Sequence, residues 1–349
     1  MPGKKAMIAM SGGVDSSVAA YLMRNAGYDC CGATMLLKDT AMCEANDARS
    51  VADRLGIPFF VFDHTDDFRC MVIEPFIRCY EEGGTPNPCV SCNRHLKFDA
   101  LLRRALDAGC DYIATGHYAK IEQNPDTGRY LLYRAGDKAK DQTYFLASLT
   151  QHQLSHTKFP LGAINKEEVR QIAETQGFVN ARKRDSQDIC FIPDGNYKAF
   201  MECYNCKTYP AGDYLDKTGN VVGRHSGAVG YTIGQRKGLG IAMGEPVYVC
   251  AKDMDKNTVT VGSNDDLFKS VLRANDWNWI PFAQLTEPIR VMAKVRYRHV
   301  EQPATVYPEE NGFARVEFDE PQRAITTGQA VVLYQGDMVI GSGTITEVL

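Results

Sequence analysis

The sequence predicts an α/β protein with a doubly wound parallel sheet, followed by two smaller β domains. One observation is the apolar strand Met7–Met10, which runs straight into a glycine-rich turn and then a helix; this order is typical of nucleotide-binding α/β folds. The second is a change in the sequence pattern along the chain. Strand and helix patterns alternate up to about residue 200, whereas short β-branched segments separated by glycine follow from about residue 205.

The first 200 residues contain apolar runs of strand length and amphipathic stretches of helix length. We expect strands at Met7–Met10, Cys31–Leu36, Pro58–Phe62 and Asp111–Thr115, and helices at Asp15–Asn25, Asn46–Leu55 and Phe98–Ala108. Parallel sheets of this kind bind ligands at the carboxyl ends of their strands. The loop after the first strand is therefore the predicted ligand site.

The rest of the chain contains short β-branched segments, which indicate small β domains. We expect strands at Asn220–Gly223, Pro246–Ala251, Thr258–Val261, Ile289–Arg296, Ala314–Phe318, Ala330–Tyr334 and Val339–Val348. With 349 residues and 44% hydrophobic composition, the chain has material for two or three compact units. We place them at residues 1–204, 205–270 and 271–349.

The loop Ser11–Ser16 reads SGGVDS and is predicted to bind phosphate. Gly12 and Gly13 let backbone amides approach phosphate oxygens, and the helix from Asp15 points its positive end at them. The loop lacks the Gly-Lys-Ser/Thr of a Walker loop and the Gly-x-Gly-x-x-Gly of a dinucleotide fold, which disfavours GTPase-like hydrolysis and hydride transfer. It resembles the PP-loop of ATP pyrophosphatases, which cleave between the α and β phosphates and transfer AMP to a substrate oxygen.

The chain has 12 cysteines, and its start, MPGKKAMIAM, leads into the first strand without a signal peptide or membrane segment. We therefore expect the reducing cytosol, where thiols are more often metal-binding, catalytic or buried than paired. Six lie in apolar patterns and are expected in the core. They are Cys30, Cys31, Cys70, Cys79, Cys110 and Cys250.

Two cysteine settings differ. Gly83–Phe98 carries Cys89 and Cys92 in a CxxC, which we place on an ordered loop because of its Pro and Asn residues. Its nearby cations, including Lys97, are expected to lower the thiol pKa values. Arg182–Tyr197 carries Cys190. Residue chemistry alone leaves alternatives open: the CxxC as half of a metal site, and Cys190 as a core residue.

Six motifs occur in this order: SGGVDSSV, GGTPNPCxxCN, DYIATGHYAK, KDQTYFL, DSQDICFI and YTIGQRKGLGI. Together they resemble the tRNA-specific 2-thiouridylase (MnmA/TrmU) family. The resemblance extends from Met7 nearly to the C-terminus, through Lys294–His299 and Ala324–Tyr334. It implies a PP-loop domain, a linking domain and a C-terminal β-barrel.

The resemblance implies ATP-dependent 2-thiolation of the wobble uridine, position 34, in the Lys, Glu and Gln tRNA acceptors. The uracil 2-oxygen would attack the α phosphate, with Mg²⁺ screening the phosphates near Asp15. Cys190 matches the persulfide carrier and Cys92 the nucleophile, and a Cys92–Cys190 disulfide would result. A sulfur-relay protein or cysteine desulfurase would supply the sulfur, and we expect a monomer.

Further site residues carry over from the family motifs. The ATP site matches Ala9, Met10, Ser11, Gly12, Gly13, Val14, Asp15, Ser16, Met35 and Gly116. The tRNA site matches Asn87, Pro88, Cys89, His117, Lys140, Asp141, Gln142, Arg296, Tyr297 and Gln329. Within it, Asn87–Cys89 match the segment that touches the target base.

Cys89 departs from many family members, which have Asp there. With Cys92 and Cys190 it makes three thiols, which could hold an iron–sulfur cluster and replace the persulfide route. Zinc is another option, and the second CxxC, Cys203 and Cys206, could complete a four-cysteine site. Other readings stay open: another PP-loop ligase, such as a tRNA lysidine synthetase or an argininosuccinate-type enzyme; a non-catalytic RNA-binding or sulfur-carrier protein; and a metal-binding structural protein.

The net charge of −4 gives no whole-molecule attraction to nucleic acid. A tRNA contact must then come from local basic runs. The candidates are Arg182–Arg184, Gln235–Lys237 and Lys294–His299. Each run taken alone is also what a solvated surface would show.

Overall fold

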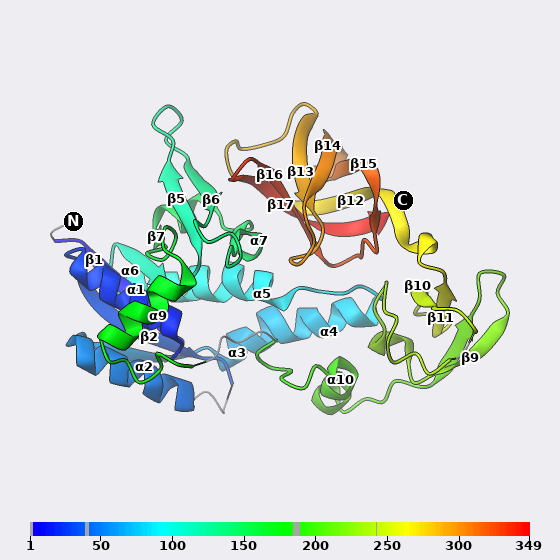
Figure 1. Cartoon of the computed structure of the whole chain (residues 1–349), viewed down its shortest axis with the longest axis horizontal. Helices are drawn as coiled ribbons and strands as arrows, with labels where there is room; N and C mark the ends of the chain where they lie inside the picture. The colour runs from blue at the N-terminus through cyan, green and yellow to red at the C-terminus, as the bar shows by residue number, and fades with distance from the viewer. Residues whose placement is uncertain (1–2, 39–41, 184–188, 242) are drawn as a thin grey trace.

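The computed structural model describes residues 3–38, 42–183, 189–241 and 243–349. A five-stranded sheet lies at one end of the molecule (Figure 1), with strands in the order β3-β2-β1-β4-β7 and all neighbours parallel. Its strands are β1 (Lys5–Ala9), β2 (Asp29–Leu36), β3 (Phe59–Asp63), β4 (Tyr112–Thr115) and β7 (Thr157–Lys158). The predicted parallel sheet is confirmed.

Helices cover both faces of this sheet, because side chains alternate along each strand. Ala6 and Ile8 face helices α1 (Val14–Asn25), α2 (Met42–Leu55) and α9 (Lys166–Thr175). Met7 faces α6 (Leu101–Asp107) on the opposite side. The fold is therefore doubly wound, as predicted.

The remaining helices connect these layers to the other units. They are α3 (Thr65–Phe68), α4 (Glu74–Glu81), α5 (Pro88–Ser91), α7 (Thr143–Leu146), α8 (Gln151–Ser155) and α10 (Tyr197–Asn205). Two π-helical segments, Arg69–Ile73 and Cys92–Ala100, and three 3₁₀ turns, Ala228–Gly230, Asp265–Leu267 and Glu310–Gly312, complete them. In the described part of the chain, no helix is both long and apolar enough to span a bilayer.

Six antiparallel strands close into the C-terminal barrel. They are β12 (Phe268–Trp279), β13 (Ile289–Lys294), β14 (Gln302–Pro308), β15 (Ala314–Arg323), β16 (Ala330–Gln335) and β17 (Met338–Val348). Closure comes from the pairing of β12 with both β15 and β17. Inward-facing apolar side chains such as Leu272, Val316 and Leu333 fill the interior. The predicted β-barrel is confirmed.

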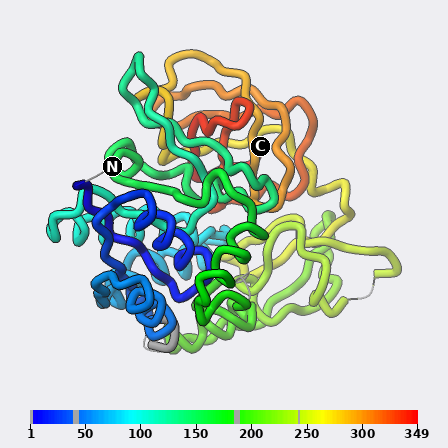
Figure 2. The backbone as a smooth tube through the Cα atoms, turned by 60° about the vertical axis from the view of Figure 1, so that its left-hand side comes forward, coloured from blue at the N-terminus to red at the C-terminus, as the bar shows by residue number. Residues whose placement is uncertain are grey.

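A hairpin from the N-terminal half joins the barrel. Strands β5 (Ala119–Gln123) and β6 (Tyr130–Arg134) pair with each other, and Tyr133 of β6 pairs with Met338 of β17. In Figure 2 the hairpin lies beside the barrel strands. The sequence analysis assigned no strand here, so the contact between the two halves of the chain was not predicted.

The middle unit is a four-stranded sheet with the order β10-β11-β8-β9. Its strands are β8 (Gly212–Leu215), β9 (Val221–His225), β10 (Tyr248–Asp253) and β11 (Thr258–Gly262). Tyr214, Val249 and Val259 form its core. The predicted small linking β domain is confirmed.

The expected core cysteines divide into three groups. Cys30 and Cys110 are buried, and Cys31, Cys79 and Cys250 are half-buried. Cys70 is exposed, so its assignment to the core was wrong. It lies in the π-helical segment Arg69–Ile73, where Val72 is the buried residue.

Candidate active site

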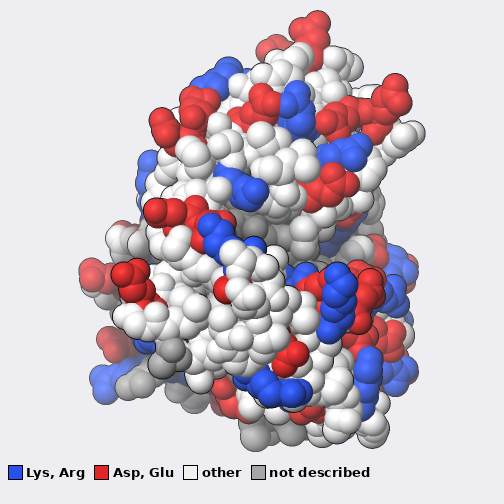
Figure 3. Space-filling model, turned by 90° about the vertical axis from the view of Figure 1, so that its right-hand side faces the viewer, with Lys and Arg blue, Asp and Glu red and all other residues white. Residues whose placement is uncertain are grey.

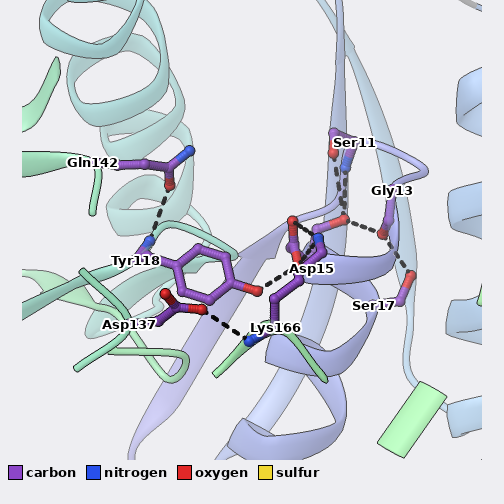
Figure 4. A network of polar contacts seen from close by, with 9 residues as sticks. Ser11, Gly13, Asp15, Ser17, Tyr118, Asp137, Gln142 and Lys166 are labelled. Atoms are coloured by element: carbon purple, nitrogen blue, oxygen red, sulfur yellow. Dashed lines mark hydrogen bonds and ion pairs between the residues drawn. The ribbon is translucent and has the colours of Figure 1, made fainter. Parts of the chain in front are cut away.

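The SGGVDS loop is held in shape by its own serines (Figure 4). The Ser16 hydroxyl accepts from the Ser11 backbone N–H at 3.2 Å and donates to the Gly13 carbonyl at 3.0 Å. Ser17 donates to the same carbonyl at 3.0 Å. Gly12 has φ +71°, a conformation that favours glycine. These hydrogen bonds, made within the loop and the first turn of α1, define the shape of the loop.

Gly116 allows a second loop to approach the start of α1. A Cβ at this position would lie 2.6 Å from the Asp15 carbonyl carbon and 2.6 Å from the Ser16 nitrogen, closer than atoms can pack. The Thr34 hydroxyl donates to the Met10 carbonyl nearby, while Met35 is half-buried in the sheet's apolar cluster. The ends of β1, β2 and β4 therefore meet at one edge, as parallel topology requires.

Asp15 is bound by two residues that the sequence analysis did not single out (Figure 4). Lys166 donates from Nζ to both carboxylate oxygens, at 2.7 and 2.8 Å, and the Tyr118 hydroxyl donates at 2.8 Å. The side chain of Lys166 is 10% exposed and that of Asp15 30%. The only sequence signal for Lys166 is its place one residue after the N-cap of α9, Asn165.

The segment after α9 also holds the loop. Asn180 donates from Nδ2 to the Gly12 carbonyl at 3.1 Å and to Ser17 Oγ at 2.9 Å. Lys183 donates to the same carbonyl at 3.3 Å and to Asp47 at 2.8 Å. Of the basic run Arg182–Arg184, Lys183 therefore faces the loop, Arg182 pairs with Glu174 at 3.4 Å, and Arg184 lies outside the described residues.

The CxxC cysteines lie on helices, so their placement on a loop was wrong. Pro88 begins helix α5, where its fixed φ fits and its missing N–H costs nothing. Cys89 is exposed in that helix, and Cys92 is the buried first residue of the π-helical segment.

Cys190 is exposed, and its carbonyl accepts from Lys38 Nζ at 2.9 Å. The next residue, Phe191, packs with Phe68 and Cys92 in one apolar cluster. The thiols of Cys190 and Cys89 lie close enough that their charges raise the pKa of Cys92. The three cysteines of the predicted thiol site are therefore neighbours, although they are separated in sequence.

Burial raises the pKa of Cys92 to about 11, while the Lys97 ammonium opposes that shift. The pKa of Cys89 is also raised by desolvation and opposed by Lys97. The expectation that nearby cations lower these pKa values was therefore wrong, because desolvation outweighs one ammonium. Lys97 also lowers the pKa of His117, after desolvation of the ring.

The residues described do not fit a metal centre. Within the described ranges, no three His, Cys, Asp or Glu side chains are arranged to hold a metal ion. This applies to Cys89, Cys92 and Cys190 as iron–sulfur ligands, and to Cys89 and Cys92 with Cys203 and Cys206 as zinc ligands. Cys203 and Cys206 lie at the exposed end of α10.

Comparison with known proteins places this geometry in a family. Family models match residues 4–194 (tRNA methyl transferase HUP domain), 198–263 (tRNA methyl transferase PRC-barrel domain) and 269–345 (Aminomethyltransferase beta-barrel domain). The tRNA-specific 2-thiouridylase MnmA of Clostridioides difficile is 48% identical over 99% of both chains. That of Moorella thermoacetica is 50% identical over 98% of this chain and 99% of its own.

The chain belongs to the tRNA-specific 2-thiouridylase family. Among solved structures, a 4-thiouridine synthetase–RNA complex with bound ATP is 18% identical, with a TM-score of 0.35. The match covers 54% of this chain and 44% of that one. At such a low score it carries no argument about this 2-thiouridylase.

Several tRNA positions inferred from the family also make contacts within the 2-thiouridylase chain. Asp141 is buried, and its carboxylate accepts from Ala135 N–H and from the Thr143 hydroxyl. Gln142 accepts from Tyr118 N–H at 3.0 Å. His117 lies 2.7 Å from the Thr115 hydroxyl, and burial lowers its pKa well below the usual value, so the ring is neutral.

The barrel positions behave similarly. Arg296 donates from Nη2 to the Ala324 carbonyl at 2.7 Å and the Ile233 carbonyl at 3.3 Å. Tyr297 packs on Phe145 with ring centroids 4.4 Å apart. Gln329 donates to Thr85. On the face shown in Figure 3, basic and acidic groups are interspersed, in keeping with the net charge of −4.

Proposed function

We propose that this chain catalyses the ATP-dependent 2-thiolation of the wobble uridine, position 34, of tRNA, with release of AMP and pyrophosphate. The carrying observation is that the Cys92 and Cys190 segments meet beside the end of β2, at the edge of the sheet that holds the phosphate loop. Cys92 packs with Phe191 and Leu37, and the Cys190 carbonyl accepts from Lys38 Nζ at 2.9 Å. One unit thus joins a phosphate loop to a pair of thiols. The names of the relatives agree with this proposal.

The first half-reaction uses the phosphate loop. The Gly12–Gly13 backbone and the positive end of α1 bind ATP phosphates, and the uracil 2-oxygen attacks the α phosphate with pyrophosphate leaving. Asp15 is the carboxylate that would hold Mg²⁺, which screens the phosphate charge when bound. Lys166 donates to both Asp15 oxygens, so its ammonium lies at the start of α1, where it can also attract phosphate oxygens.

The second half-reaction uses the thiols. Cys190 carries a terminal persulfide, and the Cys92 thiolate attacks its inner sulfur. A Cys92–Cys190 disulfide forms and hydrosulfide leaves, which displaces AMP from the 2-carbon. In the other order, the persulfide attacks the 2-carbon first and Cys92 then releases the thiolated base. Both routes end with a disulfide that an external dithiol must reduce.

The remaining assignments are proposals on family grounds. Asn87–Cys89 contact the target base, and Lys140–Gln142, His117, Arg296, Tyr297 and Gln329 form the tRNA surface of a cytosolic monomer. The Lys, Glu and Gln acceptors are the substrates, and a sulfur-relay protein or cysteine desulfurase loads Cys190. The domain boundaries stay at residues 204 and 270.

The test is nucleoside mass spectrometry on unmodified tRNA incubated with the protein, ATP, Mg²⁺ and a persulfide-loading desulfurase. We expect ATP-dependent 2-thiouridine at position 34. Cys92→Ser and Cys190→Ser should abolish it while still releasing pyrophosphate, and Asp15→Ala should abolish both. Cys203→Ser, another exposed cysteine, is the matched control.

Other outcomes would replace the proposal. AMP release with an amine rather than sulfur incorporated would favour another PP-loop ligase. Binding of tRNA without any ATP turnover would favour a carrier or RNA-binding protein. Thiolation retained in Cys92→Ser or Cys190→Ser would remove that residue from its role.

A further inference from the structure

The barrel touches the segment that precedes Cys89. The loop Thr326–Gln329, between β15 and β16, lies against Thr85 and Pro86. Thr85 N–H donates to the Thr327 carbonyl at 2.8 Å. The Gln329 amide donates from Nε2 to the Thr85 carbonyl at 2.7 Å and to the Pro86 carbonyl at 3.3 Å. Three hydrogen bonds therefore fix the backbone immediately before Asn87, across more than 240 residues of sequence.

Cys79 of α4 fills the space between the two loops. A Cβ on Gly84 would lie 2.7 Å from the Cys79 sulfur, and one on Gly328 would lie 2.4 Å from the same atom. Gly84 N–H also donates to the Cys79 carbonyl at 2.8 Å. The two glycines are thus close-packed on one thiol, with room for hydrogen alone.

The barrel loop is itself firmly held. Gly328 N–H donates to the Ile345 carbonyl at 2.8 Å, and Ile345 N–H donates to the Gln329 carbonyl at 2.9 Å. Arg296 binds the Ala324 carbonyl at the start of the loop. The contact with Thr85 therefore begins from a rigid part of the barrel.

We infer that the Thr326–Gln329 loop positions Asn87–Cys89 against the target base, with Gln329 as the positioning residue and Cys79 as the spacer. The barrel is then part of the catalytic unit. This inference rests on the proposed function, in which Asn87–Cys89 contact the target base. The contact itself can be tested without it. A misplacement of about 1 Å in such a segment is enough to slow a reaction by about 100-fold.

The first test compares Gln329→Ala with Gln335→Ala. Gln335 is a matched barrel glutamine that donates to the Arg290 carbonyl at 3.1 Å, away from the Thr85 segment. In Gln329→Ala we expect faster hydrogen exchange at residues 83–91 and single-turnover thiolation at saturating tRNA slowed at least about tenfold. Affinity for tRNA is measured alongside, because Gln329 is also a proposed tRNA contact and a loss of affinity alone would leave the rate at saturating tRNA unchanged. Gln335→Ala should match wild type in all three measurements.

A second pair tests the spacer. Gly84→Ala should slow thiolation, since its methyl group meets the Cys79 sulfur, and Cys79→Ala in the same chain should restore at least about half of the loss. Cys79→Ala alone sets the reference rate. A double variant no faster than Gly84→Ala would overturn the spacer role.

One combination of results would contradict the positioning role of Gln329. If Gln329→Ala weakens tRNA binding in parallel with thiolation and leaves hydrogen exchange at residues 83–91 unchanged, Gln329 is a tRNA contact only, and the inference is overturned. If the wild type transfers no sulfur, the proposed function fails instead. Hydrogen exchange still decides whether Gln329 holds the segment.

Discussion

At the scale of single residues, the Cys92 thiol is protonated at neutral pH, because burial raises its pKa to about 11. Lys97 is the group that favours the thiolate. Cys92 must lose its proton to act as a nucleophile. The enzyme therefore depends on this ammonium and on a fall in the pKa of Cys92 as substrate binds. The Lys97 ammonium also lowers the pKa of His117.

The first prediction follows from that balance. Lys97→Met removes the cation, so the pKa of Cys92 should rise, by less than one unit. Its alkylation by iodoacetamide at pH 9 should then slow roughly fivefold. Fragment-ion mass spectrometry separates Cys92 from the exposed Cys89, which lies on the same tryptic peptide, and peptide mass separates it from the exposed Cys190. Lys97→Arg, which keeps the charge, should label at the wild-type rate. An unchanged rate in Lys97→Met would remove Lys97 from this role.

The second prediction concerns the Lys166–Asp15 pair. Lys166→Met removes the cation from Asp15 and leaves its hydrogen bond from Tyr118. The free energy of unfolding should therefore fall by about 2 kcal/mol, reduced from the buried-pair value because Asp15 is 30% exposed. Urea denaturation measures it. Lys158→Met, a lysine that packs on the Tyr112 ring, is the control.

A double variant checks the cause of that loss. If the unpaired Asp15 charge is responsible, adding Asp15→Asn to Lys166→Met should recover part of the lost stability. A further loss in the double variant would contradict this explanation.

At the scale of elements, the phosphate site depends on how closely the β4–β5 loop approaches α1. Gly116→Ala would push the Asp15 and Ser16 backbone away, so affinity for ATP with Mg²⁺ should fall at least about tenfold in calorimetric titration. Gly230→Ala, whose Cβ would meet Lys198 at an ordinary 3.5 Å, should not change it. Normal binding by Gly116→Ala would show that the loop can move aside.

Elements differ in how far the sequence predicts them. Strands β1 to β4 of the parallel sheet are apolar runs with glycine nearby, so their period and limits are visible locally. Strand β7 has only two residues, Thr157–Lys158, and was not predicted. Strand β12 was not predicted, because Asp276 has φ +50° and the register against β17 shifts between Asn275 and Asn278. Such a bulge breaks the alternation that signals a strand.

The site shows the same division. The phosphate loop and the thiols were found because each motif is continuous in sequence. Lys166 was missed because its partner Asp15 is 151 residues away, and no local pattern marks a long-range pair. The burial of Cys92 could not be predicted either. The sequence shows the cations near Cys92, but the burial that outweighs their effect on its pKa depends on the packing of the whole fold.

At the scale of the whole molecule, the hairpin β5–β6 ties the N-terminal half to the barrel. Arg134 donates to Glu301 at 2.9 Å, with side chains 13% and 26% exposed, and stacks over the Tyr334 ring at 4.0 Å. Thr143 and Tyr144 also contact barrel strand β16. The two halves are therefore packed as one body.

The fourth prediction tests that junction. Arg134→Met leaves Glu301 without its cation, so unfolding free energy should fall by about 2 kcal/mol, and residues 119–134 should exchange hydrogen faster. Arg290→Met, which breaks a mostly exposed pair with Asp319, should cost no more than about 0.5 kcal/mol. Equal losses in the two variants would show that the Arg134 pair has no special role.

The same hairpin has a consequence for how the chain is made. Leu131 and Leu132 of β6 pack in a cluster that includes Val332, Tyr334 and Val339 from the last two strands. On the ribosome the hairpin emerges about two hundred residues before these partners, so the part of the cluster that they cover remains exposed until synthesis is nearly complete. A chain that terminates early retains its phosphate loop but exposes apolar surface, which chaperones and proteases recognise.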